Sequence, residues 1–346
     1  MKNLKSTSVG LRYAGMIGTG GIGSGTFLSL EGNHTLGREE SRPCRILDRR
    51  DYCKLHIISH YVKSLLGTGF EVIPVGKVGD DEAGKRLLRE MQEAGLTTGH
   101  VRTVAGLPTL FSYCFLYPNG SGGNLTTADS ASGHVAPADI RPLENDMRRL
   151  GRRGVALAVP EVPLSARAEL LELARKHGLF SVASFTSGEM QEAVERKLFP
   201  KIDLLAVNVD EAGLAAGIPP DSGDTARIAA AAIQKLAAAN PAMWISVTGG
   251  SAGSWAWDGT RISHVPVFSV PVASTAGAGD AHISGMIAGL ALGLKLPAAQ
   301  ILGSLHAALS VTSPHTIHSG IDRESLRKLA GSSAGIPADV LALLEE

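Results

Sequence analysis

The stretch STAGAGDAH, residues 274–282, places three small residues, Gly277, Ala278 and Gly279, directly before the carboxylate of Asp280. The apolar residues that follow recur at helical spacing, namely Ile283, Met286, Ile287, Leu290 and Leu294. The small residues are therefore expected at the N-terminus of a helix, where backbone N–H groups are free and the helix dipole attracts anions. Because small side chains let a phosphate group approach the backbone closely, we predict that these three residues form an anion hole.

Asp280 permits two interpretations. As an ordinary carboxylate in the first turn of a helix, it would be stabilised by the helix dipole by roughly 0.3 to 1 kcal/mol. That interpretation explains the aspartate but not the glycines before it. As a general base, Asp280 would take the proton of an acceptor hydroxyl while the oxygen attacks a γ-phosphoryl group, which typically accelerates a reaction by about 10²- to 10⁴-fold. The anion hole would stabilise charge on the transferring group, so we predict one joint site for phosphoryl transfer.

Short β-rich runs alternate with longer helical segments from about residue 154 onward. GVALAV (154–159) predicts a buried strand, and residues 164–178 predict a helix that ends at Gly178. Further strands are predicted at FSVAS (180–184), LLAVN (204–208) and WISVTG (244–249). This alternation predicts the α/β class, with a doubly wound, mostly parallel sheet that carries helices on both faces.

The N-terminal part of the chain continues this rhythm. It predicts a helix over 53–66, a strand over 71–79 and a helix over 82–96. Two glycine-rich segments, residues 11–32 and 108–127, interrupt the rhythm and predict strands of a small β lid beside the main sheet. The polar stretch from Gly32 to Arg50 is expected to be an irregular loop. We predict a single domain over residues 1–346.

Charge and composition favour a small-molecule substrate. The chain has 33 Lys and Arg against 33 Asp and Glu, so no global field would attract nucleic acid or an acidic membrane surface. Three cysteines without a C-x-x-C pair argue against a disulfide framework and a zinc knuckle. No run of about 18 apolar residues indicates a membrane span. We therefore expect a cytoplasmic protein with neither a nucleic-acid nor a membrane partner.

Two shorter motifs suggest other chemistry less strongly. GTGGIG (18–23) satisfies the G-x-G-x-x-G pattern of dinucleotide-binding domains, which makes an NAD-dependent enzyme an alternative hypothesis. That motif should open a helix, whereas the residues that follow it here are glycine-interrupted and strand-like. His56 and His60 form H-x-x-x-H with Ile57 where a zinc protease has glutamate, so we interpret them as helix-face or core histidines.

STAGAGDAHISG is similar to the C-terminal signature of the ribokinase-like, or PfkB, family of carbohydrate and nucleoside kinases. This resemblance implies a ribokinase-like fold, ATP as the phosphoryl donor and Mg²⁺ as a cofactor. It also implies that Asp280 is the catalytic base, in contact with the substrate, and that residues 277–279 form the anion hole.

Two further motifs resemble the donor site of that family. NVDE resembles its N-x-x-E motif, which implies that Asn208 and Glu211 hold Mg²⁺, largely through water, and that Asn208 also contacts the nucleotide. TGGSAG (248–253) resembles the turn that lines the ATP site in the family. The residues implied for ATP binding are Thr248, Gly249, Gly250, Ser251 and Gly253, together with Gly279.

The acceptor half of the chain departs from the family pattern. Glu161 in VPEVP lies where sugar kinases of this type often have a glutamate near the acceptor hydroxyls, which implies a substrate contact. The aspartate of the family's first strand is replaced by Gly23, and the G-G-x-x-x-N stretch falls at residues 53–58 with neither glycine nor asparagine. Ser274 replaces an aspartate that often helps form a monovalent-cation site, so the sequence leaves potassium activation open.

We therefore predict an ATP-dependent kinase that phosphorylates a hydroxyl group of a small polyhydroxylated substrate, such as a sugar, a nucleoside or a polyol. The altered acceptor half keeps a second hypothesis open, a ribokinase-fold protein that binds nucleotide and has lost the reaction. A homodimer through the lid strands is a further hypothesis, because small sheets carry unpaired edges that another chain can cover.

Overall fold

The largest feature of the molecule is a nine-stranded sheet. The computed structural model describes residues 2–5, 10–119, 122–218 and 223–345. In spatial order the strands are β13 (Ile262–Val265), β12 (Ser254–Trp257), β11 (Trp244–Thr248), β10 (Leu204–Asn208), β9 (Phe180–Ala183), β8 (Gly154–Ala158), β1 (Gly15–Thr19), β4 (Glu71–Gly79) and β5 (His100–Val104). Neighbours from β5 to β11 are parallel, whereas β11, β12 and β13 pair antiparallel. The predicted α/β class with a mostly parallel sheet is confirmed.

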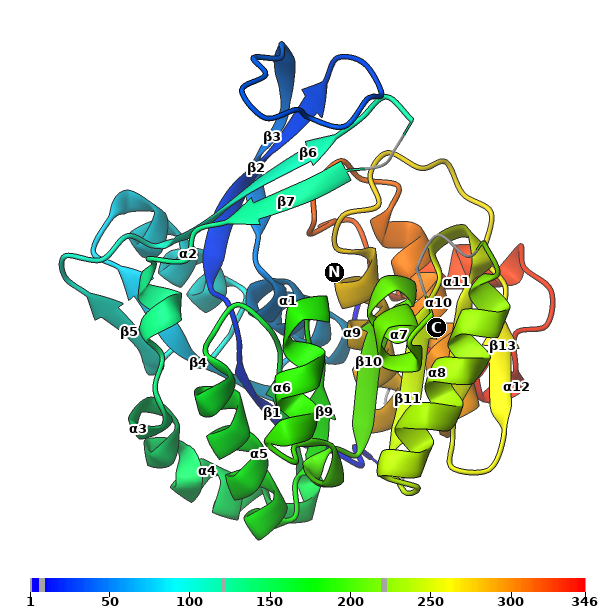
Figure 1. The fold of residues 1–346 in the computed structure, drawn as a ribbon. Helices are drawn as coiled ribbons and strands as arrows, with labels where there is room; N and C mark the ends of the chain where they lie inside the picture. The colour runs from blue at the N-terminus through cyan, green and yellow to red at the C-terminus, as the bar shows by residue number, and fades with distance from the viewer. Residues whose placement is uncertain (1, 6–9, 120–121, 219–222, 346) are drawn as a thin grey trace.

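A second sheet of four strands stands apart from the first. Its order is β3 (Cys44–Tyr52), β2 (Gly23–Leu30), β6 (Leu110–Leu116) and β7 (Gly122–Thr126). Figure 1 shows this sheet extending above one end of the main sheet. We call these four strands the lid.

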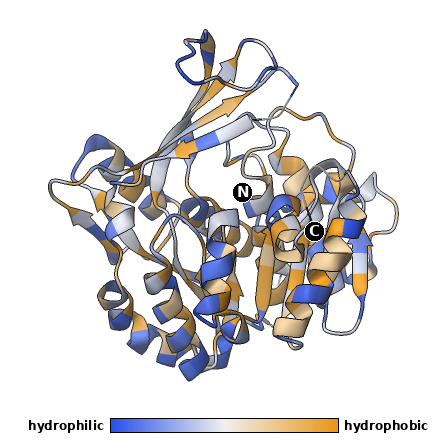
Figure 2. Ribbon diagram, viewed as in Figure 1, coloured by the Kyte–Doolittle hydropathy of each residue, from blue (hydrophilic) through white to orange (hydrophobic). Residues whose placement is uncertain are grey.

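Helices cover both faces of the main sheet, as predicted. They are α1 (Lys54–Leu66), α2 (Glu82–Glu93), α3 (Pro137–Ile140), α4 (Glu144–Leu150), α5 (Leu164–His177), α6 (Met190–Glu195), α7 (Val209–Ala216), α8 (Thr225–Ala239), α9 (Ala278–Ala291), α10 (Leu296–Ser310), α11 (Arg323–Gly331) and α12 (Ala338–Leu344). Buried side chains of α1, α2 and α9 to α12 form one core cluster, and those of α3 to α8 form the other. Figure 2 shows the apolar strands between these two layers.

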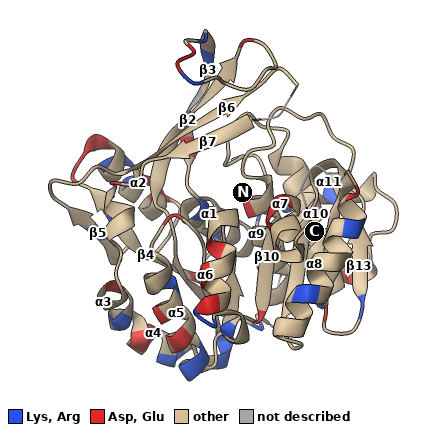
Figure 3. Cartoon of the chain, in the orientation of Figure 1, with Lys and Arg blue, Asp and Glu red and all other residues tan. Residues whose placement is uncertain are grey.

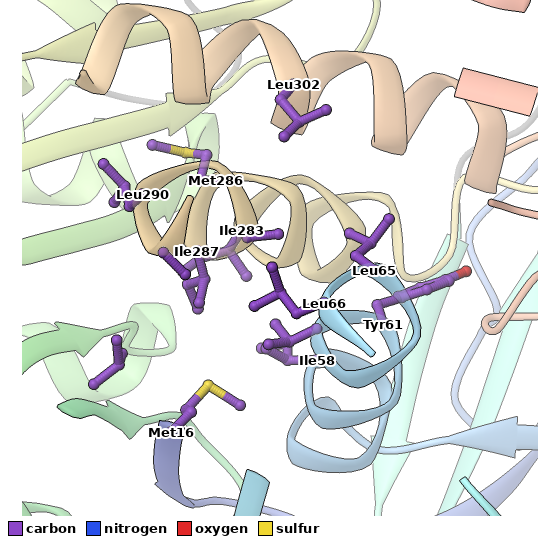
Figure 4. Close-up of a cluster of buried hydrophobic side chains, with 14 of the residues drawn as sticks. Met16, Ile58, Tyr61, Leu65, Leu66, Ile283, Met286, Ile287, Leu290 and Leu302 are labelled. Atoms are coloured by element: carbon purple, nitrogen blue, oxygen red, sulfur yellow. The ribbon is translucent and has the colours of Figure 1, made fainter. Parts of the chain in front are cut away.

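The alternation of side chains along β1 assigns its residues to the two layers. Met16 belongs to the first core cluster and Ile17 to the second, because successive side chains of a strand point to opposite faces. Figure 4 shows Met16 below Ile58 of α1 and Ile287 of α9. Met16 thus packs with α1 and α9 in one layer of the core, and both helices begin at the candidate site described below.

The structure corrects two expectations about the N-terminal region. Residues 11–32, expected to lie in the lid, are divided between the two sheets, because the fully buried β1 pairs with both β4 and β8. The stretch from Gly32 to Arg50, expected to be an irregular loop, contains most of β3. Charged residues are common on edge strands such as β3, and here they concealed the strand in the sequence.

The GTGGIG motif connects β1 to β2 and opens no helix. A dinucleotide-binding motif needs a helix directly after its glycines, so this motif lacks the required structural context.

Two surface properties bear on function. Figure 3 shows Lys, Arg, Asp and Glu interspersed over the outer helices, with no face of a single sign in this view. Within the described residues, no helix is both long enough and apolar enough to span a membrane.

Candidate active site

Residues from several distant motifs meet at the carboxyl ends of the parallel strands. A cavity of about 70 Å³ at this edge is lined by Lys54, Asn208, Glu211, Thr248, Gly279 and Asp280, among others. Five of these six residues were predicted site residues. Their convergence follows from the topology, because the loops after parallel strands all emerge at the same edge of the sheet.

The predicted anion hole lies at the N-terminus of α9. Gly277 caps the helix in the left-handed region, with φ of 76°. A Cβ atom there would lie 3.1 Å from the carbonyl oxygen of Thr316, so glycine fits this position for two reasons. A Cβ atom on Gly279 would meet open space. The loop therefore presents the first turn of α9, whose N–H groups have no partner within the helix, to an uncovered region.

The side chain of Asp280 is paired with a lysine that the sequence analysis did not select. The Lys54 Nζ atom lies 3.5 Å from the Asp280 Oδ1 atom, and the Asp280 side chain is 14% exposed. Burial raises the pKa of Asp280, while the charge of Lys54 and its hydrogen bond oppose the rise. The charge of Asp280 in turn raises the pKa of Lys54. The N-cap residue of α9 is Gly277, which has no side chain, and Asp280 lies in the first turn of the helix.

Glu161 belongs to the same cluster. Its Oε2 atom accepts a hydrogen bond of 3.0 Å from the Lys54 backbone N–H. Glu161 has a φ of 77°, an uncommon conformation for a residue with a side chain, and a Cβ atom on Gly21 would collide with its carboxylate. Burial raises the pKa of Glu161 to about 7, and the charge of Lys54 opposes the rise. The N-terminus of α1 thus connects the two carboxylates.

Asn208 and Glu211 form a capping box at the start of α7. The Glu211 N–H donates to Asn208 Oδ1 at 2.9 Å, and the Asn208 N–H donates to Glu211 Oε2 at 2.8 Å. Burial raises the pKa of Glu211. Carboxylate and amide oxygens suit Mg²⁺, which keeps several waters and binds through few protein ligands. Among the described residues, no group of three or more His, Cys, Asp or Glu side chains is arranged to hold a metal ion.

The turn proposed for ATP follows β11. Thr248 ends the strand and lines the cavity, and the turn closes through a 2.8 Å bond from the Gly249 N–H to the Gly253 carbonyl. Gly250 and Gly253 have positive φ values of 56° and 89°. Ser251 is exposed. Thr248 is the residue of this turn that lines the same cavity as Asp280. The glycines of the turn give the neighbouring loop its shape.

Lys54 carried a signal that the sequence analysis overlooked. It is the first residue of α1, and the first turn of that helix contains no acidic residue. A cation at a helix N-terminus opposes the helix dipole, which favours anions there. Such a placement indicates a partner outside the helix, and here the partners are Asp280 and Glu161.

Glu161 leads to a prediction about stability. Its pKa of about 7 in the folded protein exceeds the ordinary value of 4.5, so the folded state binds the proton more tightly than the unfolded state. The stability contribution is complete below pH 4.5 and is lost as the pH rises through about 7. We expect Glu161→Gln to stabilise the protein by roughly 1 to 3 kcal/mol at pH 8 and to have little effect at pH 4.5.

Denaturant unfolding at several pH values measures this difference. Glu195→Gln, an exposed position on α6, is the matched control and should change stability little at any pH. The prediction would be contradicted if the free energy of unfolding changed with pH in the same way in the wild-type protein and in Glu161→Gln.

Comparisons with known proteins identify the family and the fold. A family model described as pfkB family carbohydrate kinase matches residues 60–323. A deoxyribokinase of Salmonella typhi is 27% identical over 246 residues, which cover 71% of this chain and 77% of the relative. A fructoselysine 6-kinase of Escherichia coli is 27% identical over 234 residues, which cover 68% of this chain and 80% of the relative.

Solved structures show the same fold. A ribokinase from Cryptococcus neoformans in complex with ADP has a TM-score of 0.75 at 20% identity, and the match covers 92% of this chain and 100% of that one. A nucleoside kinase from Burkholderia thailandensis in complex with inosine has a TM-score of 0.72 at 16% identity, with 93% and 100% covered. The predicted ribokinase-like fold is thereby confirmed.

Proposed function

The chain belongs to the pfkB family of carbohydrate kinases, phosphotransferases that act on an alcohol group, and we propose that it transfers the γ-phosphoryl group of ATP to a hydroxyl of a small polyhydroxylated substrate, a sugar, a nucleoside or a polyol. One observation carries this proposal. Asp280, in contact with Lys54, lies at the mouth of a glycine-lined helix N-terminus and in the same cavity as Asn208, Glu211 and Thr248. A base, an anion hole and oxygen ligands for a metal ion are the parts that phosphoryl transfer requires.

Asp280 acts as the general base in the proposed reaction. The proton of the acceptor hydroxyl passes to the Asp280 carboxylate while the acceptor oxygen forms a bond to the γ-phosphorus. The bond from that phosphorus to the bridging oxygen of ATP breaks, and ADP leaves with the electron pair. In this proposal, the N–H groups of Gly277 and Gly279 stabilise the negative charge on the transferring group, whereas the Ala278 N–H donates to the Thr275 carbonyl at 3.2 Å.

Lys54 holds Asp280 in its charged form before the acceptor is deprotonated. Asn208 and Glu211 are the residues that would hold Mg²⁺, largely through water, and Thr248 with the glycine-rich turn after it would contact ATP. Bound Mg²⁺ supplies charge neutralisation for the phosphates. Glu161, which is linked to Lys54, would accept hydrogen bonds from acceptor hydroxyls. The Ser274 hydroxyl accepts a 3.3 Å hydrogen bond from the Ala276 N–H within the loop.

An acceptor panel tests the function. The names of the relatives suggest 2-deoxy-D-ribose and fructoselysine, and D-ribose, D-fructose and inosine extend the panel. With ATP and Mg²⁺ we expect ADP formation that depends on at least one of these acceptors, measured by a coupled assay and by phosphorus NMR of the product. ATP binding without turnover of any acceptor would instead support the hypothesis of a nucleotide-binding protein that has lost the reaction. Stabilisation by NAD rather than by ATP in a thermal shift assay would support the nicotinamide alternative.

Exposed apolar side chains on the lid support a homodimer formed through the lid strands. Several large apolar side chains of the lid are exposed, namely Ile46, Leu47, Tyr113 and Leu125. A second copy of the chain that packs lid against lid would cover them and the open strand edges. The molar mass from light scattering coupled to gel filtration distinguishes this homodimer from a monomer.

A further inference from the structure

A second cavity lies at the edge of the main sheet opposite the candidate active site. It has a volume of about 340 Å³, and its lining includes Tyr13, Arg152, Arg175, Phe180, Lys201 and Asp203. Phe180 begins β9, whereas Ser184, which directly follows that strand, lines the active-site cavity. Likewise, Asp203 directly precedes β10 and Asn208 ends it. Figure 1 shows β10 running between these two edges, so the strands separate the two cavities.

Two arginines of this cavity come from different segments of the chain. Arg152 lies in the 3₁₀ turn directly before β8, and Arg175 lies in the last turn of α5. Arg175 donates to the Pro200 carbonyl at 3.2 Å, and neither arginine forms an ion pair with another residue that the structure describes. Lys201, in contrast, pairs with Glu172 at 2.5 Å. A cation at a helix C-terminus complements the helix dipole, which accounts for Arg175 but not for Arg152.

A glycine brings the two arginine-bearing segments together. Gly178 follows α5 in the left-handed region, with φ of 74°. A Cβ atom on this glycine would lie 3.4 Å from the Cγ atom of Arg152. The aliphatic stem of Arg152 therefore packs against the end of the helix that carries Arg175. Guanidinium groups bind phosphate oxygens through paired, charge-assisted hydrogen bonds, so two of them at one cavity favour a phosphate group.

The rest of the cavity offers an apolar wall and a hydrogen-bond acceptor. The rings of Tyr13 and Phe180 stack with their centroids 5.4 Å apart. The Asp203 Oδ2 atom accepts a 2.7 Å bond from the Ser181 N–H, which leaves its Oδ1 atom for a ligand hydroxyl. An apolar wall with a few fixed polar groups is the usual composition of a small-molecule site, and such sites commonly measure about 300 to 1,000 Å³. A cavity of about 340 Å³ is at the small end of that range.

We propose that this cavity binds a small phosphate monoester that carries hydroxyl groups, such as a sugar phosphate. Arg152 and Arg175 hold the phosphate, and Asp203 accepts a hydrogen bond from a hydroxyl. The carbon skeleton lies against the rings of Tyr13 and Phe180. This site goes beyond the proposed kinase function, because none of its residues lines the active-site cavity.

Calorimetric titration tests the proposed site, with D-ribose 5-phosphate as the probe. The double variant Arg152→Ala, Arg175→Ala should raise the Kd for D-ribose 5-phosphate by at least about 10-fold, because it removes both phosphate ligands. Both arginines are exposed, so the variant should fold, and its thermal unfolding checks this. Arg196→Ala, the matched control, removes an exposed arginine that pairs with Glu192 elsewhere and should leave the Kd unchanged.

A variant of the acceptor separates recognition of the sugar from recognition of phosphate. Asp203→Asn presents an amide N–H where the carboxylate offered an acceptor, if its oxygen keeps the bond from Ser181. It should weaken binding of D-ribose 5-phosphate relative to inorganic phosphate, which lacks carbon-bound hydroxyls, by at least about threefold. An unchanged ratio would overturn the assigned hydroxyl contact.

The binding data decide the proposal without any measurement of turnover. It would be overturned if the wild-type protein bound no D-ribose 5-phosphate at millimolar concentration. It would equally be overturned if the double arginine variant bound this probe as tightly as the wild type, since the probe would then occupy another site such as the active site. A protein that binds the probe through these arginines but phosphorylates no acceptor would refute the proposed kinase function alone.

Discussion

Asp280→Asn is expected to lower kcat by about 10²- to 10⁴-fold and to leave ATP affinity within about twofold of wild type. The amide keeps the size of the carboxylate but cannot take the proton of the acceptor hydroxyl. The anion hole at residues 277–279 consists of backbone groups, so phosphate binding should survive. Single-turnover kinetics measure the chemical step, and calorimetric titration with a non-hydrolysable ATP analogue measures nucleotide binding.

A second helix N-terminus provides the control for this experiment. Asp224 caps α8, and its Oδ1 atom accepts a 2.9 Å bond from the Arg227 N–H. Asn is also a good cap, so Asp224→Asn should change neither turnover nor stability much. If Asp280→Asn retained near-normal turnover, Asp280 would be no more than an ordinary first-turn carboxylate, and the proposed mechanism would fail.

The residues proposed for the donor half of the site could be placed from the sequence because each belongs to a local motif. Gly277 to Asp280, Asn208 with Glu211, and Thr248 each follow or precede a regular element that the sequence pattern identifies. Once the sheet is parallel, the ends of β10 and β11 must emerge beside each other, and the start of α9 packs against them. Short motifs and topology together were sufficient for these residues to be placed at one edge.

The pairing of Lys54 with Asp280 was less predictable because it depends on a contact between distant segments. Lys54 and Asp280 are 226 positions apart, and no local pattern pairs them. β3 contains a run of charged residues that resembled a loop in the sequence, and such residues are common on edge strands. The position of β1 in the main sheet was missed for a similar reason, since a glycine-rich turn joins it directly to β2 of the lid.

Lys54→Met is expected to lower kcat/KM at neutral pH by roughly 10- to 100-fold, because it removes the positive charge 3.5 Å from the Asp280 carboxylate. Lys54 opposes the effect of burial on Asp280, so its loss raises the pKa of Asp280 further. A larger fraction of the base is then protonated at neutral pH. The acid limb of the kcat/KM profile should therefore move to higher pH, and the activity of the variant should recover partly as the pH increases.

The shape of the pH profile distinguishes this role from a packing role. Lys54→Arg keeps the positive charge, so the acid limb of its kcat/KM profile should lie close to the wild-type pH. Lys77→Met removes a lysine that pairs with Asp139, away from the site, and should lower stability without moving the limb. If Lys54→Met reduced kcat/KM equally at every pH, Lys54 would not set the ionisation of the base. Its effect would then come from contact with the transferring phosphoryl group, since Lys54 and Asp280 line the same cavity.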